Sequence, residues 1–290
     1  MPLPKFEYLA PTTLEEACQL LKEKGDDARL MGGGTDLLTK MKRRVIQPNT
    51  VIGLKKIAGL DIIKVDRGKG LTIGAVALLG DVASHPQIKR FFPAIAYAAS
   101  VTANVQIRNM GTVVGNLCNA APSADNAPTL LAMDAQVTIM GVEGQRTIPL
   151  EDFFKGPGIT ALEPGEIVKE IFVPWPHPHS GVSYQHISPR SKVDISAACV
   201  AAMLVMEGNI CKEARVALGA VAPVPMRGKK TEKHLEGKEL TKETLEQAGK
   251  QASKECKPIS DMRASAQYRR LMVEVLTKRA LAEAATRARA

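Results

Sequence analysis

Apolar residues recur at every third or fourth position along residues 12–24, behind a threonine cap and with acidic residues in the first turn. This spacing predicts an amphipathic helix. A short apolar run over residues 29–31 then ends abruptly in three glycines, after which a second helix can begin at Leu37. The pattern therefore predicts a strand, a glycine turn and a helix, in that order, near the start of the chain.

The middle of the chain alternates between β-rich and helical segments. Three β-rich runs are separated by Gly and Asp turns, at residues 51–54, 62–65 and 71–75. Three helical stretches follow, at residues 79–84, 91–103 and 128–134. One further strand is predicted at residues 136–140. This alternation favours an α+β arrangement rather than repeated βαβ units.

The proline-rich stretch at residues 174–178 cannot lie inside a helix or a central strand, so we place a domain boundary near residue 175. Beyond it the pattern predicts two strands, alternating or wholly buried, at residues 196–205 and 214–220. It also predicts two helices, at residues 241–256 and 265–287. The last helix carries apolar residues at core spacing, which we interpret as a packing face: Tyr268, Leu271, Met272, Val275 and Leu276.

The composition narrows the class of protein. With 290 residues, 45% of them hydrophobic, the chain can bury a sizeable core and divide into two or three domains. No window approaches 18 uncharged apolar residues, and the first residues lack the apolar core of a signal peptide. We therefore expect a cytoplasmic protein without an integral membrane span.

The charge and the cysteines each argue against an alternative. The net charge of +9 could indicate nucleic acid, but the basic residues are scattered and aromatic residues make up only 4%, too few for stacking on bases. An acidic protein partner or a solvated surface explains the charge more simply. The five cysteines are scattered, without a CxxC motif or a Cys/His cluster for zinc or an iron–sulfur centre. We expect any metal chemistry to take place in another chain.

Two glycine-bearing loops carry the candidate chemistry. Consecutive glycines at residues 32–34, before a helix start, let the backbone turn tightly and bring bare N–H groups against an anion, for which a diphosphate is the natural ligand. The loop at residues 111–116 offers the same chemistry plus the Asn116 amide, and Asp125 follows as an acceptor for a hydroxyl-rich ligand. Neither loop has the GxGxxG or P-loop pattern, so each alone is a weak indication.

Together the two loops resemble those of a known family. Residues 32–38 (GGGTDLL) resemble the first FAD loop of the FAD-binding medium subunits of xanthine dehydrogenase and carbon monoxide dehydrogenase. Residues 106–116 (QIRNMGTVVGN), with 121–125 (APSAD) and Pro128, resemble the second. Residues 259–270 (ISDMRASAQYRR) are similar to the SDxRASxxYR segment of the C-terminal domain of these subunits. The resemblance to this molybdopterin dehydrogenase family spans nearly the whole chain.

The resemblance implies a fold. It would be α+β, with a PCMH-type FAD-binding region over residues 1–175, divided into subdomains of about 1–55 and 56–175. A C-terminal domain of antiparallel sheet and helices would follow over residues 176–290. The cofactor would lie between the two subdomains.

The resemblance also implies cofactor contacts. The FAD diphosphate and adenosine end would lie along the first loop, at Leu30, Met31, Gly32, Gly33, Gly34, Thr35, Asp36 and Leu37. The diphosphate and ribityl chain would continue along the second loop and its neighbours, at Thr102, Ala103, Gly111, Thr112, Gly115, Asn116, Cys118 and Asp125. Among these, we expect Asp125 to anchor the ribityl chain or the adenosine ribose.

Two residues farther along are implied beside the isoalloxazine. Val168 would pack on the ring, although an ordinary core strand would also place a valine there. His186 stands where the family usually has a lysine near the flavin, and it could stabilise negative charge on a reduced flavin in a pH-dependent way. A surface histidine without such a role is the alternative.

The second loop departs from the family pattern at one position and invites a covalent hypothesis at another. Val114 stands where family members usually have glycine, so the loop would have to rearrange slightly if that position required a positive φ. Cys118 raises the question of a covalent flavin link, but the resemblance implies non-covalent FAD, and small buried cysteines usually only pack.

The function implied by the resemblance is that of an oxidoreductase subunit. Its FAD would accept electrons from iron–sulfur clusters and pass them to NAD, quinone, ferredoxin or oxygen. The implied partners are an iron–sulfur subunit and a large molybdopterin subunit, in a dimer of heterotrimers.

Two alternative functions remain. One is a self-sufficient FAD-dependent oxidase or dehydrogenase; the SDxRASxxYR-like segment and the lack of a convincing acid–base cluster argue against it. The other is a structural subunit that has lost FAD, which Val114 keeps open.

Overall fold

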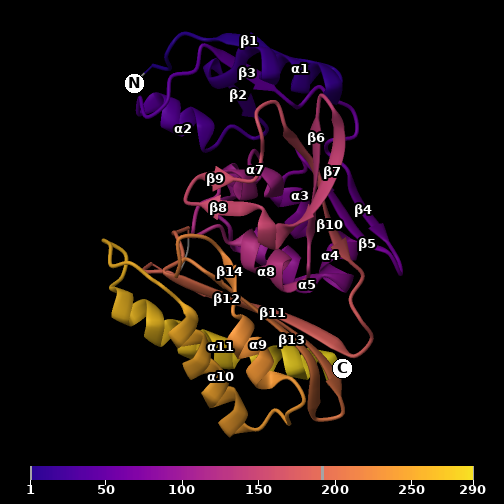
Figure 1. The fold of residues 1–290 in the computed structure, drawn as a ribbon, viewed down its shortest axis with the longest axis vertical. Helices are drawn as coiled ribbons and strands as arrows, with labels where there is room; N and C mark the ends of the chain where they lie inside the picture. The colour runs from indigo at the N-terminus through magenta and orange to yellow at the C-terminus, as the bar shows by residue number, and fades with distance from the viewer. Residues whose placement is uncertain (1, 191–192, 290) are drawn as a thin grey trace.

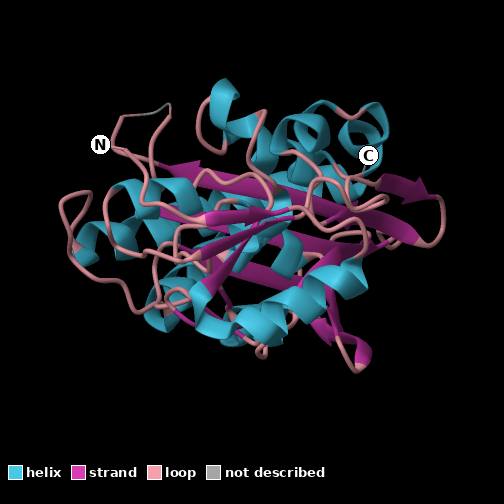
Figure 2. Cartoon of the chain, turned by 90° about the horizontal axis from the view of Figure 1, so that it is seen from above, coloured by secondary structure: helices cyan, strands magenta, loops and turns pink. Residues whose placement is uncertain are grey.

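The computed structural model describes residues 2–190 and 193–289, and it shows an α+β molecule. Three main sheets follow one another from the N-terminal part at the top of Figure 1 to the C-terminal part at the bottom. Figure 2 shows helices on both sides of the strands. Among the described residues, no helix is long and apolar enough to cross a membrane. The predicted α+β class is confirmed.

The first sheet is small and parallel. Its strands lie in the order β1 (Glu7–Leu9), β3 (Thr50–Gly53) and β2 (Ala28–Met31). Two helices and a 3-10 turn belong to the same part: α1 (Leu14–Lys24), α2 (Leu37–Lys42) and η1 (Gly25–Asp27). Thr13 caps α1, because its Oγ1 accepts a hydrogen bond from the amide of Glu16 at 3.1 Å. The first glycine loop leaves from the edge at which β2 and β3 both end.

The second sheet is antiparallel. Its strands lie in the order β4 (Ile63–Asp66), β5 (Gly70–Gly74), β10 (Ile167–Pro174), β6 (Gln136–Gly141) and β7 (Gly144–Pro149). Short helices come between β5 and β6: α3 (Leu79–Ser84), α4 (Pro86–Phe91), α5 (Pro93–Val101), α6 (Val105–Arg108), α7 (Val113–Cys118) and α8 (Asn126–Ala132). The turn η2 (Leu150–Asp152) leads into a hairpin of β8 (Phe154–Gly156) and β9 (Ile159–Thr160). The helix expected over residues 91–103 is shorter, because Pro93 begins α5 and separates it from α4.

The third sheet belongs to the C-terminal part and is buried on both faces. Its antiparallel strands lie in the order β11 (Ser180–Ile187), β12 (Ala198–Glu207), β13 (Ile210–Gly219) and β14 (Met226–Arg227). The helices of this part are α9 (Lys229–Leu235), α10 (Lys242–Glu255) and α11 (Ala266–Arg289). Alternate residues of β12 enter different cores, with Cys199 and Ala201 in the core shared with the central helices and Ala198 and Val200 in the core beneath α10 and α11. This double burial accounts for the nearly continuous apolar run of β12.

The interpretation of Tyr268 and Leu271 as core residues is wrong. Both are exposed, at 41% and 53%, whereas Leu276 is buried as expected. The buried stripe of α11 farther along the helix consists largely of alanines. It lies so close to β11 that a Cβ on Gly181 would overlap the backbone carbonyl of Ala284. The larger apolar residues at the start of the helix are left at the surface.

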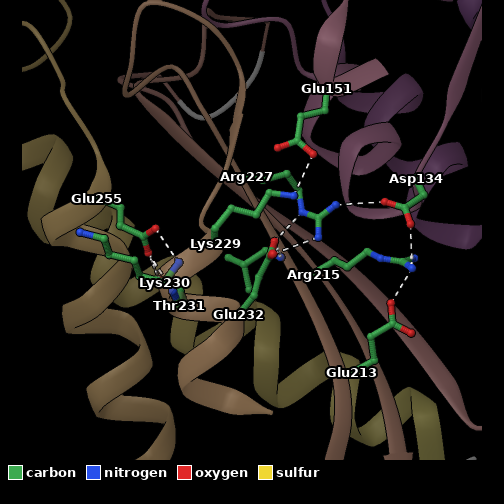
Figure 3. A network of polar contacts seen from close by, with 11 residues as sticks. Asp134, Glu151, Glu213, Arg215, Arg227, Lys229, Lys230, Thr231, Glu232 and Glu255 are labelled. Atoms are coloured by element: carbon green, nitrogen blue, oxygen red, sulfur yellow. Dashed lines mark hydrogen bonds and ion pairs between the residues drawn. The ribbon is translucent and has the colours of Figure 1, made fainter. Parts of the chain in front are cut away.

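A network of ion pairs joins the C-terminal part to the central part (Figure 3). Asp134, just after α8, pairs with Arg215 of β13 at 2.7 Å and with Arg227 of β14 at 3.0 Å. The Arg227 guanidinium is buried and also pairs with Glu232 of α9. These contacts, together with the shared core, hold the third sheet against the central helices.

Candidate functional site

A cavity of about 1130 Å³ lies where the three parts of the chain meet. Its walls come from the loop after β2, from the segments around α6, α7 and the start of α8, and from β10. The C-terminal part contributes residues 193–195 and, before α11, Met262 and Arg263. A cavity between packed units, with an apolar lining and a few polar groups, is the usual form of a cofactor site.

The cavity collects all of the cofactor contacts that the resemblance implied except His186. Its lining includes residues 30–37 together with Thr102, Ala103, Gly111, Thr112, Gly115, Asn116, Cys118, Asp125 and Val168. These residues come from segments more than 130 positions apart in the chain, and the fold brings them to one cavity.

The first glycine loop presents free backbone donors. Within residues 2–190 and 193–289, no hydrogen bond uses the amide N–H of residues 32–36, all of which line the cavity. Gly34 has φ +74°, in the left-handed region, and a Cβ there would also press on the Met31 side chain at 3.1 Å. A loop of this kind can offer several N–H groups to one diphosphate.

The two glycine loops touch each other. A Cβ added to Gly33 would overlap the carbonyl oxygen of Met110 and would lie 2.7 Å from the Cα of Gly111. A Cβ on Gly32 would by contrast lie at an ordinary 3.6 Å from Oγ1 of Thr112. Glycine at position 33 therefore permits the close approach of the second loop, and both loops form one continuous wall of the cavity.

Val114 does not disturb the second loop. It lies in α7 and is not among the residues with positive φ. Thr112 caps this helix, because its Oγ1 accepts a hydrogen bond from the amide of Gly115 at 2.8 Å. A Cβ on residue 115 would lie only 2.7 Å from that hydroxyl oxygen. Position 115, and not position 114, therefore requires glycine for steric reasons, and Val114 requires no rearrangement of the loop.

Hydrogen bonds donated by two side chains, those of Asn126 and Arg108, hold the polar wall. The Asn126 amide donates to Oδ1 of Asn116 at 3.1 Å and to Oγ1 of Thr102 at 3.2 Å. Arg108 donates to the carbonyl oxygens of Thr102 and Ala103, at 3.2 and 2.7 Å. Ala103 has φ +50°, a strained conformation for a residue other than glycine. Arg108 therefore secures a strained turn at the edge of the cavity.

Asp125 connects the cavity to the C-terminal part. Its Oδ1 accepts hydrogen bonds from the Tyr184 hydroxyl at 3.0 Å and from the Ser196 hydroxyl at 2.6 Å. Burial raises the pKa of Asp125, and these two hydrogen bonds oppose the rise. No hydrogen bond from the described residues reaches Oδ2, so this second oxygen is available to a ligand.

Much of the remaining lining is aliphatic. Val168 is buried in β10 and lines the cavity with Ile167 and Leu162. Val168 is thus a core residue of a strand that also contributes to the cavity wall, and its packing on a flavin ring stays a prediction. A flat apolar ring is the kind of group that such a wall can cover.

Cys118 lines the cavity from the end of α7, and burial raises its pKa to about 12. Its thiol is therefore protonated at neutral pH and is a poor nucleophile. Among the described residues, no group of three or more His, Cys, Asp or Glu could hold a metal ion.

His186 lies outside the cavity lining. Its ring stacks on that of Tyr184, with the centroids 5.8 Å apart, and Tyr97 of α5 approaches both rings. Because the Tyr184 hydroxyl donates to Asp125, the connection of His186 to the cavity runs through these two residues.

Several residues of the site gave no signal in the sequence. The Lys40 amino group donates to Oδ1 of Asn119 at 2.8 Å, and both residues line the cavity. Tyr184 and Ser196 reach Asp125 from positions 59 and 71 residues away, which no local pattern reports. Asn126 could have been suggested, because it lies between Asp125 and Pro128, both of which belong to the residues that resemble the second FAD loop.

Comparison with known proteins identifies the family. The protein-family model for the FAD binding domain in molybdopterin dehydrogenase matches residues 4–176, more than half of the chain. The chain belongs to this family. A second model, described as the CO dehydrogenase flavoprotein C-terminal domain, matches residues 183–284. The resemblance is confirmed, FAD is the cofactor of the family, and the chain is a flavoprotein subunit of an oxidoreductase.

Relatives and solved structures match over almost the full length. The carbon monoxide dehydrogenase medium chain of Hydrogenophaga pseudoflava is 35% identical over 278 residues, 96% of either chain. The xanthine dehydrogenase FAD-binding subunit of Escherichia coli O157:H7 is 32% identical over 96% of this chain and 95% of that one. A structure of the Hydrogenophaga pseudoflava carbon monoxide dehydrogenase that lacks the Mo-pyranopterin moiety matches with a TM-score of 0.95, at 36% identity and 99% coverage of each chain.

Proposed function

We propose that this chain holds one FAD non-covalently and carries electrons within a molybdenum hydroxylase or dehydrogenase complex. The observation that carries the proposal is the contact of the two glycine loops at Gly33, because it sets free amide donors beside the capped helix α7. That arrangement suits an elongated anionic cofactor better than a small substrate. In this proposal the organic substrate binds to another subunit.

The proposed roles of the lining residues follow from their chemistry. The free amides of residues 32–36 bind the diphosphate. Asn116 and the free Oδ2 of Asp125 bind hydroxyl groups of the ribityl chain or the ribose. Val168 and its aliphatic neighbours cover the ring. We also propose a domain boundary near residue 175, which the two matched ranges, 4–176 and 183–284, support.

The proposed electron path needs partners. FAD, when bound, can accept single electrons and release pairs, to NAD, quinone, ferredoxin or oxygen. The clusters that supply the electrons and the molybdopterin belong to two further subunits, in a dimer of heterotrimers. Support comes from the relative named as a medium chain and from the matching structure of a carbon monoxide dehydrogenase.

The experiment that tests the proposal is spectroscopic. The chain is purified alone and together with the subunits encoded beside it, its visible spectrum is recorded, and the chromophore is extracted with acid. Released FAD at one per chain, with iron–sulfur absorbance only in the co-purified complex, is the expected result. A chain that stays colourless with added FAD contradicts the flavoprotein proposal. Substrate turnover by the lone FAD-loaded chain would instead indicate a self-sufficient oxidase.

A further inference from the structure

Large apolar side chains are exposed on the loop before α11 and on the first turns of that helix, and one of them lines the cavity. We call these four residues the α11 edge: Ile259, Met262, Tyr268 and Leu271. Ile259 is 70% exposed and Met262 95%. Met262 also lines the cavity, as do two further exposed aliphatic residues, Val193 and Ile195. The four residues fall between positions 259 and 271, and Tyr268 and Leu271, three positions apart in α11, share one face of the helix. Exposed apolar side chains concentrated in one segment mark a candidate interaction surface.

The loop that carries Met262 is firmly held. Asp261 accepts hydrogen bonds from two amides of the loop and, at 2.8 Å, from the buried guanidinium of Arg269. Arg269 also donates to the carbonyl oxygens of Ala197 and Ala220, which lie next to β12 and β13. The SDxRASxxYR-like segment therefore fastens the loop to the third sheet. In Figure 1 this yellow loop projects beyond the start of α11. These hydrogen bonds therefore hold Met262 in its exposed position.

Basic residues accompany the α11 edge. Lys257, Arg263 and Arg270 alternate with it along the chain, and all three are exposed. Asp261 pairs with Arg263 and Arg269, which leaves Lys257 and Arg270 as the cations of this segment without a salt bridge among the described residues. An apolar surface with a cationic rim fits a partner that presents an apolar centre ringed by carboxylates.

We propose that the α11 edge is the docking surface for the iron–sulfur subunit that delivers electrons to this chain. The inference rests on the proposed function. Electron transfer requires the cluster to approach the cofactor closely, and Met262 and Ile195 belong both to the cavity wall and to the exterior. A partner seated on the α11 edge therefore reaches the mouth of the cavity on the side of the C-terminal part. The charge on this segment favours a partner surface with an excess of carboxylates over a second copy of this chain, whose own net charge is +9.

The test compares charge-introducing variants of the full FAD-loaded chain. Leu271→Asp alters the α11 edge outside the cavity lining, and Met262→Asp alters its most exposed residue. Val142→Asp is the matched control, because Val142 is a similarly exposed aliphatic residue on the β6–β7 turn. The flavin-to-protein ratio is measured first, and then the Kd for the purified iron–sulfur subunit.

Leu271→Asp is expected to keep its FAD and to weaken binding of the iron–sulfur subunit at least about tenfold, because a buried unpaired carboxylate is costly. Binding by the unaltered chain should also weaken as salt is raised. Wild-type affinity in both Leu271→Asp and Met262→Asp, or an equal loss in Val142→Asp, overturns the proposal. So does a result in which Leu271→Asp only dissociates a dimer of this chain. An FAD-free starting protein would instead count against the proposed function itself, and its spectrum reveals that before any binding is measured.

Discussion

Gly33 lies against the carbonyl oxygen of Met110 so closely that no side chain fits between the two glycine loops. Gly33→Ala is therefore expected to push the second loop away from the first, at a cost of about 1–3 kcal/mol for overpacking. Because both loops line the cavity, the FAD affinity should fall by about tenfold or more. Titration of the FAD-free chain with FAD, followed by flavin fluorescence, measures the change.

A matched control separates this steric effect from the general cost of replacing a glycine. Gly156 lies in β8, outside the cavity lining, and a Cβ there would make only an ordinary contact at 3.5 Å with Ile159. Gly156→Ala should leave FAD binding unchanged. Full FAD affinity in Gly33→Ala would show that the contact between the loops is dispensable.

The hydrogen bond from Tyr184 to Asp125 gives a second prediction. Tyr184→Phe removes one of the two donors to Oδ1, and it should lower the free energy of unfolding by about 1–2 kcal/mol. The FAD affinity should fall as well, because the carboxylate loses part of its orientation. Tyr97→Phe is the control, since Tyr97 lies in the same aromatic group but is half exposed. Equal effects of the two substitutions would count against a specific role for the hydrogen bond.

Asp125 should also make the stability of the FAD-free chain depend on pH. Burial raises its pKa above the ordinary 3.8, so the folded chain binds this proton more tightly than the unfolded chain. The stability that results is fully present below the unfolded pKa and is lost as the pH rises through the raised folded pKa.

Asp125→Asn isolates this contribution, because the amide oxygen can still accept from Tyr184 and Ser196 but the side chain cannot ionise. Denaturant unfolding of both chains over a pH series should show the variant gaining stability relative to the wild type as the pH rises above 3.8. A difference between the two chains that is constant over this range would contradict the prediction.

The parts of the fold that follow from short-range pattern were predictable. The run of glycines after residues 29–31 indicated where β2 ends and α2 begins, and Pro174 lies at the end of β10. Strand β11 escaped notice because it mixes apolar and polar residues. Its Ser183 is buried, and its hydroxyl donates to Glu283 of α11 at 2.5 Å, a partner 100 residues away. A local sequence pattern cannot indicate that a buried serine finds a hydrogen-bond partner so far away in the chain.

The candidate site likewise has one part that local sequence indicates and another that only the packing of distant segments determines. The resemblance supplied the residues of both glycine loops, because their spacing along the chain is short. It did not supply the contacts from Tyr184 and Ser196 to Asp125, or the place of Met262 at the cavity, since these depend on how the third sheet packs on the central helices. The exposure of Leu271 has the same origin, because the alanine stripe of α11 decides which face of the helix packs.

The ion pairs of Asp134 carry the last prediction. Asp134 has φ +51°, which asparagine tolerates, so Asp134→Asn removes the charge without straining the backbone. Each arginine keeps another acidic partner, Glu213 for Arg215 and Glu232 for Arg227, and the Asp134 side chain is partly exposed. The free energy of unfolding should therefore fall by only about 1 kcal/mol.

The more informative readout of Asp134→Asn is cofactor binding. Asp134 is the member of the network that links the central helices to β13 and β14, and the C-terminal part contributes one side of the cavity. Loss of this link should weaken FAD binding a few-fold, and the effect should shrink at high salt because screening already weakens the pairs. Glu213→Gln removes a pair within β13 and leaves the link intact, so FAD affinity should stay at the wild-type value. If both variants lose affinity equally, the ion pairs across the boundary do not position the C-terminal side of the cavity.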